Sequence, residues 1–118
     1  MDLSNLSTEI DLETTLDRLC GDSALLLEIL DLFLDEFATE QTHLLDRVHV
    51  GDYAGLASKA HYFKGVAQNL GLLKFLPEVQ LLEQAAKQND STSCVQALNS
   101  LHEIAHRILA LRKNMQAA

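Results

Sequence analysis

The fold is decided by residues 53–71, which read YAGLASKAHYFKGVAQNLG. At about 100° per residue, the apolar side chains of this stretch fall on one stripe of a helix. The stripe consists of Tyr53, Leu56, Ala60, Phe63, Ala67 and Leu70. Asp52 is a suitable N-cap before the stretch, and Gly71 is a suitable residue to end it. We therefore expect an amphipathic helix whose apolar stripe packs against other elements.

Four more amphipathic helices are expected from the same periodicity and from cap residues. They cover roughly residues 8–19, 23–48, 73–88 and 91–113. Because proline is tolerated only in the first turn of a helix, Pro77 places the start of the fourth helix nearer Leu76. Ser91 or Thr92 is expected to cap the fifth.

The apolar stripes of the long helices show how they assemble. These stripes are Leu26, Leu30, Phe33, Phe37, Leu44 and Val48, then Leu76, Val79, Leu82 and Ala86, and finally Cys94, Leu98, Leu101, Ala105 and Ile108. No alternating pattern typical of strands competes, and short connections make successive helices antiparallel. The chain is therefore predicted to be all-α. We expect an up-down antiparallel four-helix bundle with a short additional N-terminal helix, in one domain over residues 1–118.

The composition excludes several classes of function. Of 118 residues, 47% are hydrophobic, and the net charge is −8. Such an acidic chain is unsuited to binding nucleic acid, which needs clustered Lys and Arg, and to docking on anionic membranes. No apolar run approaches about 20 residues, and the first residues do not resemble a signal peptide, so a cytoplasmic protein is expected. Cys20 and Cys94 lack metal-binding spacing and are expected to be free thiols buried in helices.

His61 is the candidate reactive residue among five histidines. Phasing places it about 130° from the centre of the apolar stripe, on a solvent-facing side with Ser58, Gly65 and Gln68. A neutral imidazole offers its Nε2 lone pair to phosphorus, and the Lys64 ammonium can offset the charge of a phosphoryl group. A glycine in a helix interior costs about 1 kcal/mol relative to alanine, so Gly65 indicates that a partner approaches closely here.

The segment around His61 resembles the signature of a known family. It reads Ala60-His61-x-x-Lys64-Gly65-x-Ala67-x-Asn69-x-Gly71, which is similar to histidine-containing phosphotransfer (HPt) domains of two-component phosphorelays. Similar residues also stand in the family's places at Leu34-Asp35-Glu36-Phe37, Gly51-Asp52 and Leu82-Glu83. The likeness therefore covers nearly the whole chain.

The resemblance implies a four-helix bundle in which His61 accepts a phosphoryl group, with Lys64 and Gly65 as its supporting neighbours. Some members of the family use a polar or basic side chain on the next helix near the phosphate. Glu83 and Lys87 are the matching positions. Because a carboxylate repels a phosphoryl group, we expect Glu83 to have a structural part instead.

The resemblance also implies the partners. His61 would accept a phosphoryl group from a receiver-domain phospho-aspartate and relay it to an aspartate of another receiver, in a pathway with a sensor or hybrid histidine kinase. The expected contact surface surrounds His61, Gly65 and Gln68, with apolar contacts from the edges of the second and third helices. We expect a carrier rather than an enzyme, without ATP, metal or other cofactor of its own, and Mg²⁺ on the receiver. The alternative is a helical interaction module that binds receiver domains without being phosphorylated.

Two histidine motifs raise a third class, a metal enzyme. His102-Glu103-Ile104-Ala105-His106 has the H-E-x-x-H spacing of zinc proteases, and Glu40-x-x-His43 with Glu103-x-x-His106 has the spacing of di-iron bundles. No possible third ligand follows His106, and no glutamate occurs in residues 53–70. Phasing also turns these histidines away from the apolar stripes. Both motifs are therefore interpreted as solvated helix faces.

Overall fold

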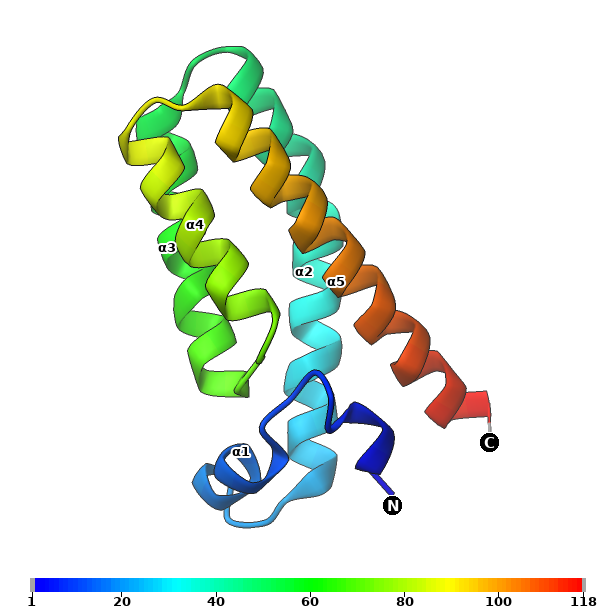
Figure 1. The fold of residues 1–118 in the computed structure, drawn as a ribbon. Coiled ribbons are helices and arrows are strands. Elements are labelled where there is room, and N and C mark those ends of the chain that lie inside the picture. The colour runs from blue at the N-terminus through cyan, green and yellow to red at the C-terminus, as the bar shows by residue number, and fades with distance from the viewer. Residues whose placement is uncertain (1, 118) are drawn as a thin grey trace.

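The computed structural model describes residues 2–117 and is built almost entirely of helices. They are η1 (Ser4–Leu6), α1 (Leu12–Arg18), α2 (Ser23–His49), α3 (Tyr53–Leu70), α4 (Phe75–Lys87) and α5 (Ser91–Ala117). In Figure 1, helices α2 to α5 run alternately up and down, and α1 lies at the end of the bundle where α3 finishes. The predicted up-down four-helix bundle with a short N-terminal helix is confirmed.

The predicted bounds hold best for the long helices. The α3 helix begins after Asp52, whose Oδ1 accepts a hydrogen bond from the Gly55 N–H group at 3.0 Å, as an N-cap should. Helix α4 begins at Phe75, which leaves Pro77 in its first turn. The first helix is shorter than expected. Residues 8–10 lie outside it because the chain there forms a bridge to the α3–α4 turn.

Two local predictions are wrong, and both concern turns. Asp90, not Ser91 or Thr92, caps α5, because its carboxylate accepts hydrogen bonds from both the N–H group and the hydroxyl of Ser93, at 3.1 and 2.7 Å. Cys20 is exposed rather than buried. It lies in the turn after α1, in a left-handed conformation with φ of 56°, and so does not belong to a helix face.

Four phenylalanines form the centre of the core. Phe33 and Phe37 of α2 meet Phe63 of α3 and Phe75 of α4, with ring centroids 5.0 to 6.4 Å apart. All four are buried, and burial of one such side chain stabilises a fold by about 1.5–3 kcal/mol. The other predicted core positions, Cys94 among them, are also buried, apart from the half-buried Tyr53, Leu76 and Ala105. The cluster holds α3 between α2 and α4.

The N-terminal segment, residues 2–22, closes the C-terminal end of α3. A helix leaves its last four carbonyl groups without partners inside the helix. In this chain other groups satisfy all four. The contacts are Leu72 N–H to Ala67 O, Arg18 Nη2 to the carbonyls of Gln68 and Asn69, and the Thr15 hydroxyl to Leu70 O. The end of α3 is therefore fastened by residues from far earlier in the sequence.

Gly71 makes this fastening possible. It ends α3 as predicted, in a left-handed conformation with φ of 67°. A Cβ atom at this position would overlap the hydroxyl oxygen of Thr15 and lie 3.3 Å from the carbonyl oxygen of Asp11. The Asp11 N–H group also donates a hydrogen bond to the Gly71 carbonyl at 2.8 Å. Gly71 therefore serves both as the end of α3 and as the place where the N-terminal segment approaches it.

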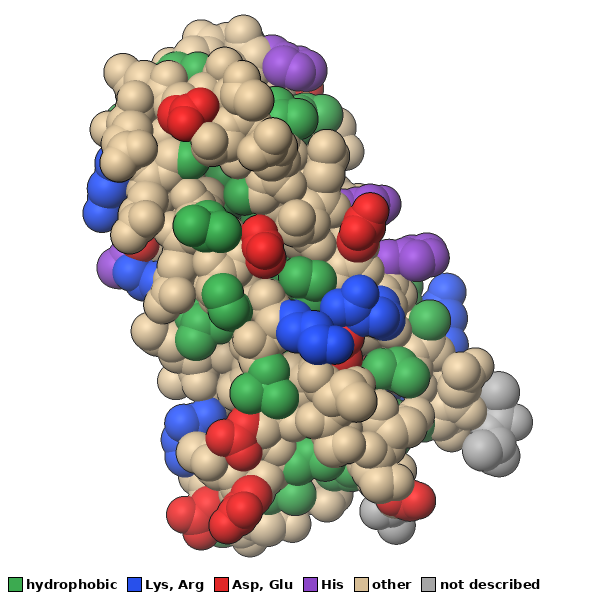
Figure 2. Space-filling model, viewed as in Figure 1, with side chains coloured by type: hydrophobic (Ala, Val, Ile, Leu, Met, Phe, Trp, Pro, Cys, Tyr) green, Lys and Arg blue, Asp and Glu red, His purple; other side chains and the backbone are tan. Residues whose placement is uncertain are grey.

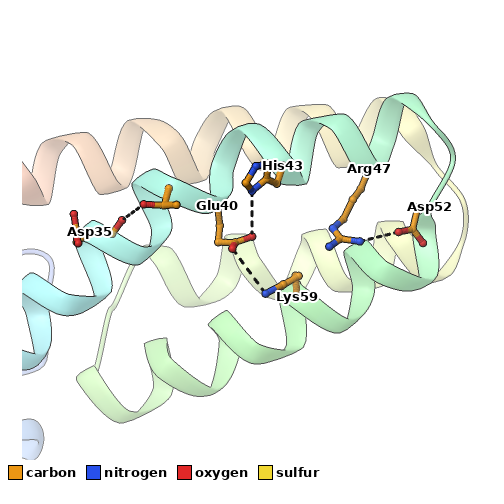
Figure 3. A network of polar contacts seen from close by, with 7 residues as sticks. Asp35, Glu40, His43, Arg47, Asp52 and Lys59 are labelled. Atoms are coloured by element: carbon orange, nitrogen blue, oxygen red, sulfur yellow. Dashed lines mark hydrogen bonds and ion pairs between the residues drawn. The ribbon is translucent and has the colours of Figure 1, made fainter.

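Polar contacts fasten the opposite end of α3 to α2 (Figure 3). Arg47 on α2 donates a hydrogen bond to Asp52, with Nη1 and Oδ2 2.7 Å apart. Gly55 leaves room for this pair, because a Cβ atom there would overlap both side chains. Nearer the middle of α2, Glu40 lies 3.9 Å from the ammonium of Lys59 on α3. The histidine helix is thus held at both of its ends.

Candidate functional site

His61 lies near the middle of α3 with 70% of its side chain exposed. Its neighbours Ala60 and Phe63 are buried on the opposite side of the helix. Ser58 and Gln68, which share the face of His61, are exposed as phasing predicts. The structure therefore gives a core-facing stripe and a solvent-facing histidine on one rigid helix.

The imidazole of His61 is held by a carboxylate from the neighbouring helix. Its Nδ1 atom lies 2.8 Å from Oε2 of Glu83 on α4. The side chain of Glu83 is only 8% exposed, so its position is set by packing. An ionised carboxylate can only accept hydrogen bonds, so Nδ1 carries the proton and donates it. The Nε2 atom of His61 then bears the free lone pair.

Lys64 completes the contacts of this carboxylate. Its ammonium donates a hydrogen bond to Oε1 of Glu83 at 2.7 Å, so the two oxygens serve different partners. The ammonium of Lys87, one turn further along α4, lies 3.8 Å from Oε2, and its side chain is 66% exposed. Lys64 and Lys87 thus approach the same carboxylate from two helices, and Lys87 is the more accessible of the two cations.

The charge of Glu83 is maintained by these neighbours. The hydrogen bond from Lys64 lowers the pKa of Glu83 most, and the hydrogen bond with His61 and the charge of Lys87 lower it further. Burial of the carboxyl group acts in the opposite direction but is outweighed. Glu83 therefore remains a carboxylate, and an acceptor for His61, to lower pH than an ordinary glutamate.

Gly65 lies on the same face as His61 and leaves open space there. A Cβ atom at Gly65 would meet no heavy atom within 4 Å. This differs from Gly55, where the Arg47–Asp52 pair already occupies the space. No internal contact therefore explains the absence of a side chain at Gly65, and close approach by a partner stays a prediction.

The α3 helix is also distinct in charge. The protein carries 17 Asp and Glu against 9 Lys and Arg, yet residues 53–70 contain no Asp or Glu. They do contain Lys59 and Lys64. A doubly charged phosphoryl group and an acidic partner would therefore meet little repulsion from the exposed face of this helix.

The competing histidine motifs do not form metal sites. His102, Glu103 and His106 are exposed on α5, and Nδ1 of His102 lies 2.7 Å from Oε1 of Gln41 instead of facing a third ligand. His43 is exposed on α2. Figure 2 shows histidine side chains at both the left and the right edges of the visible face. Among residues 2–117, no group of three or more His, Cys, Asp or Glu side chains could hold a metal ion.

Sequence reasoning missed the contact between Glu83 and His61. The carboxylate was expected to have a structural part because it would repel a phosphoryl group. It does contribute structure, but it does so by orienting the imidazole through the nitrogen that faces away from solvent. The available signal was that Glu83 follows core residue Leu82 directly, so it stands at the edge of the core beside α3.

Comparison with known families agrees with the geometry. Residues 28–117 match the family model described as the Hpt domain, a range that covers α2 from Glu28 onward together with α3, α4 and α5, and leaves α1 outside. No curated protein and no solved structure matches the chain. In the part of the chain that the structure describes, no helix has the length and apolar character needed to cross a membrane.

Proposed function

Because the chain belongs to the Hpt family of histidine phosphotransfer domains in two-component systems, we propose that it relays a phosphoryl group between two receiver domains through Nε2 of His61. The observation that carries this proposal is the hydrogen bond between Nδ1 of His61 and Glu83. It leaves the nucleophilic nitrogen directed to solvent, where a partner can reach it.

The transfer step needs no cofactor on this chain. The Nε2 lone pair attacks phosphorus, an N–P bond forms, and the bond between phosphorus and the aspartate oxygen of the receiver breaks, so that the carboxylate leaves with its electron pair. The imidazole becomes cationic as this happens. Glu83 stabilises that charge through the Nδ1–H group, as a carboxylate does for other catalytic histidines. Transfer to a second receiver is the reverse reaction.

Charge neutralisation is the other requirement of phosphoryl transfer. We assign it on this chain to Lys64, with Lys87, which lies farther from Glu83, as a second cation. Gln68 and Ser58 stand on the exposed face on either side of His61 along the helix, and they are assigned to partner contact. The divalent metal, Mg²⁺, and the groups that activate the aspartate belong to the receiver in this proposal.

Partner docking is assigned to the open face around Gly65. Tyr62, the residue after His61, is 49% exposed, and the nearby Glu36 carboxylate on α2 raises its pKa. This tyrosine supplies the apolar contact expected at the edge between α2 and α3. Tyrosines of this kind often dominate binding energy at interfaces.

The test is incubation of the protein with receiver domains phosphorylated on aspartate, followed by detection of phosphate on the chain that is labile to acid and stable to base. We expect label on wild type and none on His61→Gln. His102→Gln, which changes an exposed histidine of the same kind on α5, is the matched control and should be labelled normally. Receiver binding that persists in His61→Gln, with no label on wild type, would instead support the interaction module.

A further inference from the structure

Arg18, the last residue of α1, lies at the C-terminal end of the histidine helix. Its Nη2 atom donates hydrogen bonds to the carbonyls of Gln68 and Asn69, at 3.0 and 2.9 Å. The residue is exposed. Arginine has five N–H groups, and the contacts to α3 use Nη2 alone. Among the described residues these are the hydrogen bonds that the Arg18 side chain makes, so its Nε and Nη1 donors are available to acceptors outside the protein.

The position of Arg18 relative to the reactive face follows from the helix that it caps. Gln68 and Asn69 follow His61 by two turns, which corresponds to about 11 Å along the axis at 1.5 Å per residue. They stand on the same side of α3 as His61 and Gly65. Arg18 is thus held at the border of the exposed face, at the C-terminal end of α3.

A partner that delivers phosphorus to His61 has to cover this border. Reacting atoms must come within about 3–3.5 Å, so the interface is centred on the imidazole. A specific interface covers about 800 Å² of each partner, which for a round patch is a radius of about 16 Å. The helix positions of Gln68 and Asn69, whose carbonyls bind the guanidinium, are displaced from His61 by about 11 Å along the axis, which is inside that radius.

We propose that Arg18 is a docking residue for the receiver domain and that it donates hydrogen bonds from Nε and Nη1 to acceptor oxygens of that partner. The inference rests on the proposed phosphotransfer function. A receiver that holds a phospho-aspartate is negative around its reactive centre, and guanidinium groups suit oxygen acceptors through paired, charge-assisted hydrogen bonds. The face of α3 next to Arg18 has no acidic residue to compete for it.

The location of Arg18 also suits it to distinguish between partners. Helix α1 precedes residues 28–117, the part that matches the Hpt family model. The matched bundle contains the reactive histidine and its supporting residues. A cation supplied from outside it adds a contact without altering the positions of His61, Lys64 or Glu83.

The experiment compares wild type, Arg18→Gln and Lys113→Gln. Lys113 is an exposed cation near the far end of α5, so both variants lose one positive charge. The donor is whichever phosphorylated receiver of the source organism labels wild type fastest. We expect Arg18→Gln to raise KM for this receiver about tenfold while kcat changes less than about twofold, since one such contact corresponds to about 1.4 kcal/mol. Lys113→Gln should match wild type, and Arg18→Lys should recover part of the loss.

Two further measurements separate docking from structure and from chemistry. Phosphoramidate, a small donor that needs no docking, should label wild type and Arg18→Gln at the same rate. An equal loss of labelling rate with both donors would show that Arg18 acts only by holding α3, and would overturn the proposal.

Binding of the unphosphorylated receiver is measured in the His61→Gln background, where Arg18→Gln should raise Kd by a similar factor. If Arg18→Gln leaves both Kd and KM for the receiver unchanged, the docking role is overturned and the phosphotransfer function stands. If wild type takes up no label but Arg18→Gln still weakens receiver binding, the phosphotransfer function is overturned and the docking role stands.

Discussion

Nδ1 of His61 on α3 and Oε2 of Glu83 on α4 lie 2.8 Å apart, and this contact joins an exposed ring to a buried acid. The exposed imidazole has no packing of its own to select a rotamer or a tautomer. Glu83 selects both, because its carboxylate can only accept a proton from the ring. The orientation and the tautomer of His61 are therefore set by a residue on another helix.

Replacing Glu83 with glutamine tests this relationship. An amide can present either its oxygen or its NH₂ group to Nδ1, and it cannot stabilise the ring charge that develops during transfer. A hydrogen bond to a charged group is worth about 1.5–3 kcal/mol, so we expect transfer from a receiver to slow by about 10- to 100-fold. Glu78→Gln on the same helix is the matched control. Equal rates for the two variants would contradict the orienting role of Glu83.

Lys64→Met should slow transfer by about tenfold, because the phosphoryl group would lose the cation that the proposal assigns to it. Circular dichroism should show a folded bundle, since methionine preserves most of the side-chain volume. Lys59→Met removes the other cation of α3, which pairs with Glu40 and not with Glu83, and should leave the rate unchanged. A similar loss in both variants would indicate a general charge effect instead.

Gly65→Ala is expected to separate stability from function. The new methyl group enters open space, so helix propensity alone should stabilise the protein by about 1 kcal/mol in thermal or urea unfolding. Transfer from a receiver should decrease, and Gly65→Glu should block it while phosphoramidate still labels His61. The control is Gly55→Ala, which should destabilise the fold because its methyl group would overlap Asp52 and Arg47. Full transfer by Gly65→Glu would remove the argument for close approach.

Gly71→Ala is expected to be the most damaging glycine substitution. It places a side chain at a φ of 67° and also against Thr15, whose hydroxyl holds the end of α3. Gly21→Ala has a similar φ of 77° but meets nothing within 4 Å. The left-handed conformation alone costs about 1–2 kcal/mol in both variants. Any further decrease in the free energy of unfolding of Gly71→Ala, relative to Gly21→Ala, therefore measures the contact between the N-terminal segment and α3. Urea unfolding of both variants gives this difference, and equal losses would show that the contact contributes nothing.

Acid should destabilise the protein through Glu83. Its native pKa is lowered below the ordinary value of 4.5, so the unfolded chain binds more protons than the native protein as pH falls. The stabilisation is complete above about pH 5–6 and is lost progressively below pH 4.5. Asp52 and Asp90, whose hydrogen bonds at helix starts lower their pKa values, act in the same direction. Urea unfolding between pH 3 and 7 should show a weaker pH dependence for Glu83→Gln than for wild type.

The fold could be predicted in most respects because it depends on periodic residues. The stripes of α2, α3 and α5 contain buried apolar side chains at helical spacing, and Asp52 and Gly71 mark the ends of α3 by local rules that need no tertiary information. The misplaced cap of α5 is a local error, in which a carboxylate one residue earlier proved the better acceptor.

Only the part of the site that lies within the single helix α3 could be predicted from the sequence. His61 and Gly65 share a face because of their spacing, which phasing reveals. The contacts of Glu83 with His61, and of Arg18 with the end of α3, join residues 22 and 50 positions apart in the sequence. Their geometry depends on how α4 and α1 pack against α3. No periodicity within a single helix contains that information.

The residues assigned to the chemistry all belong to one helical hairpin, α3 and α4 with their short connection, whereas Arg18 reaches it from α1. In the proposed relay, partner recognition and transfer chemistry therefore rest on different helices of one chain. A substitution at Arg18 is expected to change how tightly a receiver binds while the histidine, its acid and its cations keep their positions.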